Sequence, residues 1–231
     1  MAMMTDAVMA VWNDVVPDVD AEFNDWYVRD HLPDRVSLPG FQRGRRWISD
    51  GASPRYFTFY EIDDVSVMNS AVYLDRHENP TEWTRRIMPA FVGMNRSICR
   101  VTAKRGEADG GIAGLVRLAP QPNAEDRLRT WLSAEILPRL LETPGILAAS
   151  LWELEGKASR MPVTAETRLR ATTDAVIDWA VVIEAGRPEE VDTASVFLAP
   201  DAARAAGAAS VSPSEVYRLL GSLRHDLACA R

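Results

Sequence analysis

Short runs of alternating apolar and polar residues, typical of half-buried β-strands, are separated along the chain by segments with helical spacing. In one such run, Tyr56, Thr58 and Tyr60 fall on one face of a strand and Phe57 and Phe59 on the other. The N-terminal part of the chain has the order strand, helix, strand, strand, helix, strand. Its predicted strands are Val8–Trp12, Phe41–Ile48, Arg55–Ile62 and Arg96–Val101, and its predicted helical segments are Asp20–His31, Val65–Tyr73 and Thr81–Phe91.

The same order of elements returns in the C-terminal part. A polar, glycine-containing stretch, 105–111, is expected to be a linker, so the sequence predicts two domains, 1–104 and 112–231. The second domain has a longer predicted loop at Gly156–Asp174. Its predicted strands are Ile112–Leu118, Ile146–Glu155, Val176–Glu184 and Glu215–Leu220, and its predicted helices are Glu125–Leu141 and Ala199–Ala209.

A sequence motif also occurs twice. Residues 26–47 and 131–152 align without a gap at a constant offset (131 − 26 = 105), and roughly one identical pair would be expected by chance over such a window. A long period seen only twice indicates a duplicated domain. The identical pairs are Trp26 and Trp131, Leu32 and Leu137, Pro33 and Pro138, Pro39 and Pro144, Gly40 and Gly145, and Trp47 and Trp152.

The two copies differ in the polar residues that could carry out a reaction or bind a ligand. The polar residues His31, Arg43 and Arg45 of the first copy are replaced by Ile136, Ala148 and Ser150 in the second. We therefore expect the first copy to carry the functional groups and the second copy to be mainly a scaffold.

The order β-α-β-β-α-β is that of a ferredoxin-like unit, so the predicted fold class is α+β. A four-stranded antiparallel sheet with helices on one face leaves its other face bare, and that face must be buried. Two tandem ferredoxin-like domains can bury these faces against each other. We therefore expect two four-stranded antiparallel sheets packed face to face as an intramolecular α/β barrel.

The first copy of the motif resembles a known family. Trp26-Tyr27, followed by His31-Leu32-Pro33 and by Leu38-Pro39-Gly40, is similar to the EthD-like, antibiotic-biosynthesis-monooxygenase-like branch of the dimeric α/β-barrel superfamily. The resemblance implies a histidine near the barrel opening at the end of the first helix. It also implies a range of activities: cofactor-free monooxygenases, isomerases, polyketide cyclases, haem-degrading oxygenases and accessory proteins.

Composition and charge limit the classes of molecule that the protein is expected to bind. The net charge of −7 disfavours nucleic-acid binding, because phosphate neutralisation needs a basic surface. No apolar run is long enough to cross a membrane. The only cysteines, Cys99 and Cys229, lie far apart and no leader segment is evident, so we expect a cytoplasmic protein with reduced thiols. A homodimer is possible. No metal-ligand spacing occurs among the histidines and cysteines, and no cofactor is expected.

His31 is the first catalytic candidate, because an imidazole transfers protons near neutral pH. Asp30 beside it is expected to orient the ring, and Tyr60 to hold a developing oxyanion. Pro33 is expected to end or kink the helix just after His31. The alternatives for His31 are a charge that stabilises the helix C-terminus and a structural hydrogen bond.

The remaining candidates would bind a substrate. If Phe57 and Phe59 meet the helices, the tyrosines on the other face of that strand enter the barrel. Buried arginines there would need an anionic partner, either a ligand or a carboxylate such as Glu61. The other reading of the aromatic residues is an ordinary core. The substrate-binding candidates are Trp12, Tyr27, Tyr56, Thr58, Arg43 and Arg45.

These observations favour a cofactor-independent enzyme that acts on a small, apolar, cyclic or aromatic molecule by proton transfer, as an isomerase, cyclase, lyase or monooxygenase. The alternative is a binding or accessory protein of the same fold without turnover. A haem protein, with His31 as the axial ligand, is a further alternative that only the histidine supports.

Overall fold

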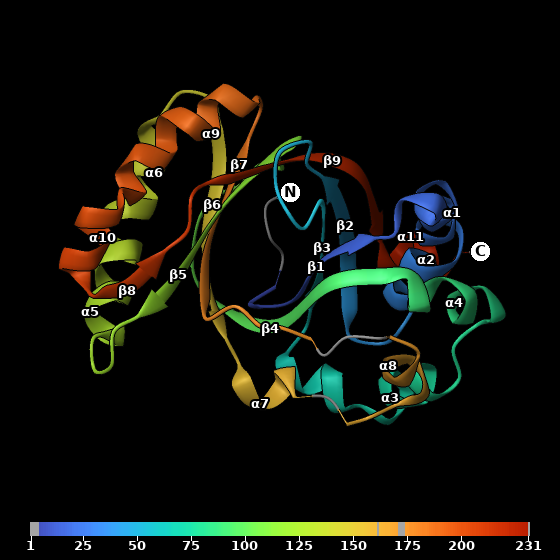
Figure 1. Ribbon diagram of the computed structural model, residues 1–231. Coiled ribbons are helices and arrows are strands. Elements are labelled where there is room, and N and C mark those ends of the chain that lie inside the picture. Colours follow the sequence, from blue (N-terminus) through green and yellow to red (C-terminus); the bar gives the residue numbers. More distant parts are fainter. Residues whose placement is uncertain (1–4, 161, 171–173, 231) are drawn as a thin grey trace.

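The computed structural model describes residues 5–160, 162–170 and 174–230. Antiparallel strands form a closed barrel. The helices of residues 20–87 cover one side of it, and the helices of residues 125–142 and 188–206 cover the opposite side (Figure 1). The strands are β1 (Ala7–Val15), β2 (Phe41–Ile48), β3 (Tyr56–Ile62), β4 (Phe91–Gly106), β5 (Ile112–Pro120), β6 (Ile146–Leu154), β7 (Trp179–Ala185), β8 (Ala208–Val211) and β9 (Glu215–Arg224).

The barrel closes through strand edges. Around the ring the strands follow the order β7-β6-β4-β1-β3-β2-β9-β5, and the pairing of β5 with β7 completes it, while β8 adds to β5 outside the ring. Strands of the first half occupy β4-β1-β3-β2, and strands of the second half occupy β9-β5-β7-β6 in the corresponding order. The closed antiparallel barrel expected from the sequence is therefore present.

The edge strands of the two halves pair with each other. β2 pairs with β9, and β4 pairs with β6 from Cys99 to Gly106. This second pairing explains why β4 runs beyond the predicted end at Val101: its last residues satisfy the open edge of β6. The linker is correspondingly shorter than the predicted 105–111, because Gly106 still belongs to β4.

The helices lie outside the barrel. They are α1 (Asp20–Trp26), α2 (Leu32–Val36), α3 (Ala71–Glu78), α4 (Glu82–Ile87), α5 (Glu125–Trp131), α6 (Leu137–Glu142), α7 (Gly156–Ser159), α8 (Ala165–Leu169), α9 (Pro188–Ser195), α10 (Pro200–Ala206) and α11 (His225–Ala228). None of the helices in the described ranges is long and apolar enough to cross a membrane. The predicted loop 156–174 contains α7 and α8.

The helix that carries His31 does not end there. A π-helical turn, Tyr27–His31, joins α1 to α2. Pro33 has no amide hydrogen and its ring would crowd the carbonyl four residues earlier, so a locally wider turn lets the helix continue. The second half has a π-helical turn at the corresponding place, Leu132–Ile136, ahead of Pro138.

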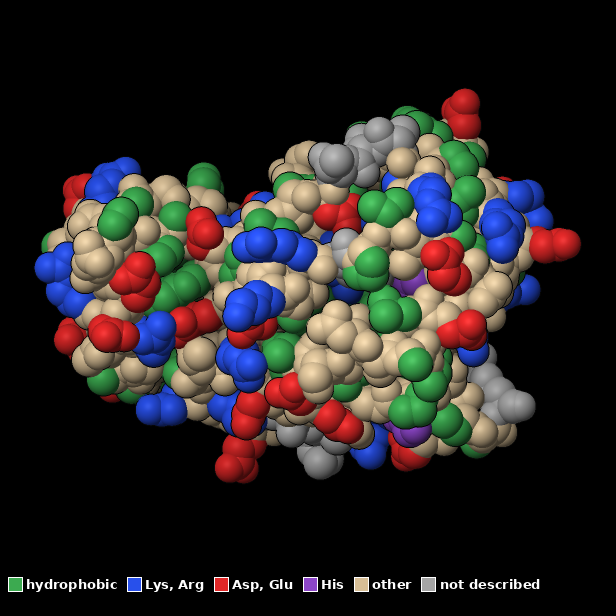
Figure 2. All heavy atoms as spheres, turned by 90° about the horizontal axis from the view of Figure 1, so that it is seen from below, with side chains coloured by type: hydrophobic (Ala, Val, Ile, Leu, Met, Phe, Trp, Pro, Cys, Tyr) green, Lys and Arg blue, Asp and Glu red, His purple; other side chains and the backbone are tan. Residues whose placement is uncertain are grey.

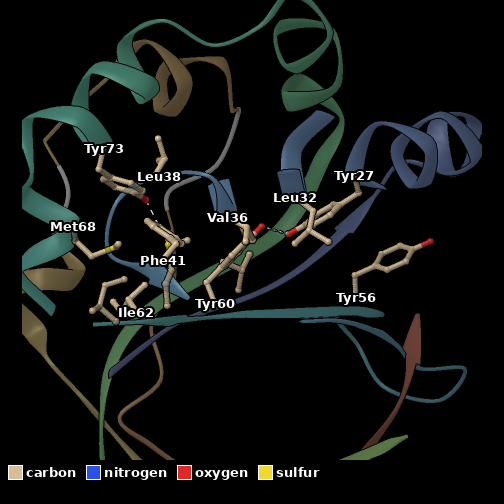
Figure 3. Packing of buried hydrophobic residues seen from close by; sticks show 14 of the residues in the cluster. Tyr27, Leu32, Val36, Leu38, Phe41, Tyr56, Tyr60, Ile62, Met68 and Tyr73 are labelled. Atoms are coloured by element: carbon tan, nitrogen blue, oxygen red, sulfur yellow. Dashed lines mark hydrogen bonds between the residues drawn. The ribbon is translucent and has the colours of Figure 1, made fainter. Parts of the chain in front are cut away.

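Aromatic side chains fill the barrel interior. Phe57 and Phe59 point inward, and Phe57 stacks on Trp12 with ring centroids 4.8 Å apart. Tyr56 and Tyr60 therefore point outward, against the helices, as Figure 3 shows. Phe57 and Phe59 do not meet the helices, so the condition under which these tyrosines would enter the barrel is not met. Alternation places the two sets on opposite faces but does not say which face meets the helices.

Two buried arginines join the halves at one end of the barrel. Arg43 Nε donates to Glu61 at 2.7 Å, and its Nη1 donates to Asp109 at 2.7 Å. Both terminal nitrogens of Arg45 bind the Glu184 carboxylate of the other half, at 2.7 and 2.8 Å. A bulge between Phe41 and Arg43 turns Phe41 to the helix side, so it does not share a face with the arginines as expected.

Charge is mixed on the face shown in Figure 2, where Lys and Arg side chains lie among Asp and Glu side chains. This face offers no extended basic surface of the kind that nucleic acid requires.

Arg45→Met is expected to lower the free energy of unfolding by about 3–5 kcal/mol, because it leaves the buried Glu184 carboxylate without its cation. Denaturant unfolding measures this. The control is Arg55→Met, which removes an exposed pair with Asp20 and should cost less than about 1 kcal/mol. Adding Glu184→Leu to Arg45→Met should restore part of the loss, and a double variant no more stable than the single one would contradict the assignment.

Candidate functional site

The candidate site is a small cavity between the outer face of the N-terminal sheet and its helices. It has a volume of about 30 Å³, enough for a water molecule or two. It does not lie inside the barrel, where aromatic side chains occupy the space between the two sheets. Its polar lining consists of His31, His77, Tyr27, Tyr60, Tyr73, Arg35, Arg96, Arg170 and Glu166.

His31 reaches the cavity from the π-helical turn. Its ring stacks on Trp26, with centroids 4.4 Å apart, and meets the edge of Tyr27 at 5.1 Å. The Nδ1 atom is buried and has no hydrogen-bond partner among the residues described. Burial, followed by the charge of nearby Arg35, holds the pKa of His31 well below its usual value. His31 is therefore a neutral imidazole at pH 7, able to accept a proton, and it carries no charge for the helix C-terminus.

Asp30 does not orient His31 as the sequence suggested. Its carboxylate accepts hydrogen bonds from the Thr81 hydroxyl at 3.0 and 3.1 Å, at the start of α4. The π-helical turn sets Asp30 toward α4 and His31 toward the cavity. The Trp26 ring holds the imidazole instead, and Trp26 Nε1 is fixed by a 3.1 Å hydrogen bond to Thr84.

Tyr27 and Tyr60 meet above the sheet. Their hydroxyl oxygens lie 3.2 Å apart, one from the helix and one from β3 (Figure 3). Burial raises the pKa of Tyr27 and raises the pKa of Tyr60 well above its usual value. Both phenols therefore keep their protons at neutral pH, and either hydroxyl can donate a hydrogen bond to a ligand oxygen.

Positive charge surrounds this pair. Arg35 forms ion pairs with Glu166 and, at 2.9 Å, with Asp34. Arg170 pairs with Asp174 at 2.9 Å. The buried Arg46 lies over the Tyr27 ring at 4.3 Å, and burial lowers its pKa. These cations disfavour protonation of His31 and favour negative charge on any ligand beside it.

The C-terminal half contributes to the site. The long connection between β6 and β7 crosses to the N-terminal half, where α8 packs beside α3 (Figure 1). Glu166 lies on α8, and Arg170 is the first residue after this helix. The second half is therefore more than the scaffold expected from the sequence, because it covers the cavity and supplies two of its charged groups.

Several candidate residues lie elsewhere. Trp12 is inside the barrel, with the Arg117 guanidinium 4.9 Å above its ring, and Arg43 and Arg45 belong to the ion-pair cluster at the barrel end. The Tyr56 hydroxyl binds Asp20 at 2.6 Å, away from His31. Thr58 is buried on the helix side, near Tyr27.

Several site residues carry little signal in the sequence. His77 has no pattern of partners around it in the sequence, yet it is 4% exposed and its ring packs on Tyr73 with centroids 4.5 Å apart. Arg96 shares one face of β4 with Met94 and Ile98. A charged residue on an otherwise apolar strand face could have marked it as a candidate site residue. Glu166 and Arg170 come from a segment too distant in sequence to be placed.

The residues around His31 do not fit a haem. An axial histidine normally donates its second ring nitrogen to a carboxylate or carbonyl, and His31 Nδ1 has no such partner among the described residues. Within the same described ranges, no cluster of three or more His, Cys, Asp or Glu residues could hold a metal ion.

No protein-family model and no curated protein sequence matches the chain. Solved structures match its fold over nearly its full length. An anthrone oxidase-like protein gives a TM-score of 0.62 at 11% identity, with 95% of this chain and 92% of that chain covered. A protein from Fusobacterium nucleatum subsp. nucleatum, provisionally assigned as a monooxygenase, gives 0.59 at 10% identity, with 96% of both chains covered. A variant chlorite dismutase from Candidatus Nitrospira defluvii gives 0.56 at 10% identity, with 93% and 91% covered.

At these identities the likeness establishes the fold alone. The chain shares the α/β barrel fold of monooxygenase-like and chlorite dismutase proteins, which confirms the expected barrel. Its placement in the EthD-like branch stays a prediction.

The free energy of unfolding is expected to fall as the pH is lowered below about 6.5. Burial depresses the pKa of His31 and of His77 in the folded protein, so below that pH the unfolded chain binds more protons. Each histidine should contribute a slope of up to about 1.4 kcal/mol per pH unit. Urea unfolding from pH 8 to pH 5 measures this slope.

The variant His31→Gln/His77→Gln should flatten the dependence, whereas His225→Gln, outside the cavity, is the matched control. Equal slopes in the wild type and the double variant would show that these imidazoles are not buried and neutral.

Proposed function

We propose that this protein is a cofactor-independent enzyme that removes a proton from a small, largely apolar, cyclic or aromatic substrate, with His31 as the base. One observation carries the proposal: a partly buried, neutral imidazole, whose buried Nδ1 has no hydrogen-bond partner among the described residues, lines a cavity together with protonated tyrosine hydroxyls. A base that is neutral at pH 7 and donors placed to receive negative charge are the two groups such a reaction needs.

We infer further that the chain is a tandem duplication of a ferredoxin-like domain. The repeated motif supports this, as do the π-helical turns at corresponding places and the same strand order in both halves. Only the first copy carries the histidine. Both cysteines are free thiols, which supports the expected cytoplasmic location.

Proton transfer would proceed in the space between β3 and the π-helical turn. His31 takes a proton from a carbon or hydroxyl conjugated with a carbonyl group. The resulting anion places its charge on oxygen, where Tyr60 or its partner Tyr27 donates a hydrogen bond. The neighbouring guanidinium groups of Arg35 and Arg46 lower the energy of that anion through space.

Oxygenation is the version of this reaction that the structural neighbours favour, since they include an anthrone oxidase-like protein and a provisionally assigned monooxygenase. The overall change for an anthrone is anthrone + O₂ → anthraquinone + H₂O. The anthrone anion gives its electrons to O₂, a carbon–oxygen bond forms, and the imidazolium of His31 returns its proton to the peroxide. Loss of water then leaves the quinone.

Such a substrate requires the cavity to open. Three of its wall residues are Met9, Met88 and Met94, whose unbranched side chains change rotamer readily. The covering helix α8 is short and comes from the other half. Movement of these groups would admit a ring system without disturbing the barrel.

Anthrone is the first probe, and O₂ uptake together with anthraquinone absorbance is the measurement. His31→Gln should lower kcat by about 10²- to 10⁴-fold, the usual contribution of a general base. Tyr60→Phe should lower kcat less, because Tyr27 remains. Asp30→Asn is the matched control and should have little effect, because Asp30 binds Thr81 rather than the imidazole.

An unchanged kcat in His31→Gln would remove the histidine from the mechanism. If instead native mass spectrometry finds one molecule bound and released chemically unchanged, the protein is a carrier or sensor of the same class of compound.

A further inference from the structure

We propose that Arg96 is the binding group for a carboxylate on the substrate, so that the natural ligand is a cyclic or aromatic acid. This inference rests on the proposed function, because it assigns a substrate class to the same cavity. It uses a residue that the proton transfer does not.

Arg96 is buried, and no described residue forms an ion pair with it. It lies in β4 opposite Val11 of β1, is 3% exposed, and lines the cavity. One terminal nitrogen, Nη2, lies 3.0 Å from the Tyr73 hydroxyl and 3.5 Å from the Met68 sulfur. The Nε and Nη1 atoms have no hydrogen-bond partner in the described part of the chain.

Such a group is costly to bury. A guanidinium carries five hydrogen-bond donors and keeps its charge at any physiological pH, and a buried charge without a counter-ion destabilises the fold unless a ligand supplies one. Tyr73 and Met68 provide dipoles but no negative charge. The unused donors of Arg96 are therefore the strongest sign in this cavity that an anion binds there.

The other arginines of the cavity behave differently. Arg35 is paired with the Glu166 carboxylate, and Arg170 is paired with Asp174. The cavity lining thus contains three arginines and one carboxylate, while both of its imidazoles are held neutral. The charge that faces the cavity is therefore net positive. Among the residues described, Arg96 is the arginine of this lining that no carboxylate neutralises.

A carboxylate suits the position better than a larger anion. It is flat and can accept two hydrogen bonds side by side from one guanidinium. The same cavity already contains a carboxylate bound by an arginine, because Arg35 Nη2 donates a hydrogen bond to Glu166 Oε2. The walls beside Arg96 are the apolar side chains of Met9, Met94 and Phe91, which fit the ring of a cyclic acid rather than a hydrated phosphate.

The geometry gives the acid an orientation. Its carboxylate would lie on β4, and its ring would extend beneath the helices toward His31 and the tyrosine pair. Arg96 would then position the substrate and would not take part in proton transfer.

Two matched pairs of probes test this assignment: benzoate against benzamide and 1-naphthoate against 1-naphthamide, by calorimetry and by quenching of tryptophan fluorescence. The wild type should bind each acid at least about tenfold more tightly than its amide, since a charge-assisted bidentate pair is worth that much. Arg96→Met should abolish the preference and leave the amide affinity unchanged.

The control is Arg100→Met on the same strand, because Arg100 is exposed and pairs with Glu155. It should retain the full preference. Arg96→Met should also be at least as stable as the wild type without ligand, because it removes a buried charge that no carboxylate balances.

Equal affinity for acids and amides in the wild type would overturn the inference, as would a preference that survives in Arg96→Met. A melting temperature of ligand-free Arg96→Met more than about 5 °C below the wild type would also overturn it, by making Arg96 a structural residue. His31→Gln separates the two proposals. If the His31→Gln variant keeps both the preference for acids and the wild-type kcat, the carboxylate site at Arg96 is supported and the proposed role of His31 in catalysis is wrong.

Discussion

Closure of the barrel is the constraint on which the rest of the structure depends. Both four-stranded sheets have a face that must be buried and edges that must be paired, and the pairings β2–β9 and β4–β6 satisfy these needs within one chain. The interior then fills with aromatic rings such as Trp12, Phe57 and Trp152. The cavity that His31 lines lies instead on the outer face of the N-terminal sheet, beneath the helices.

Electrostatics under the helices follows from this arrangement. Burial keeps His31 and His77 neutral and keeps Tyr27 and Tyr60 protonated, while Arg35, Arg46 and Arg96 remain charged in the same region. A base without a proton beside donors and fixed positive charge is an environment for forming an organic anion. The second half completes it through Glu166 and Arg170, so the C-terminal part of the chain contributes to the site as well as to the fold.

The sequence predicted the elements of the fold well, because alternation and turn residues are local signals. The strand Phe41–Ile48 has the predicted bounds, and the barrel could be inferred from the bare faces of two sheets. The face that each strand turns toward the helices could not be inferred. Alternation separates the residues into two faces but does not identify which face is inside the barrel. This is why the sequence left open whether Tyr56 and Tyr60 enter the barrel. Pro33 was expected to end or kink the helix after His31. The helix instead continues through a π-helical turn, which directs Asp30 and His31 to different neighbours.

The site itself was only partly predictable. His31, Tyr27 and Tyr60 belong to neighbouring elements and came from motif and alternation. His77, Arg96, Glu166 and Arg170 meet them through contacts between segments distant in sequence, which local patterns do not encode. Arg43 and Arg45 stood out as candidates because two charges in a strand are conspicuous, and carboxylates of the protein satisfy them.

The central claim is that His31 is a partly buried, neutral base, and NMR of the ¹⁵N-labelled imidazole tests it most directly. A titration from pH 8 to pH 5 should show the His31 ring nitrogens staying at neutral-imidazole shifts well below pH 6.5, in a single tautomer. A ring that titrates near pH 6.5, like a histidine in water, would contradict the account.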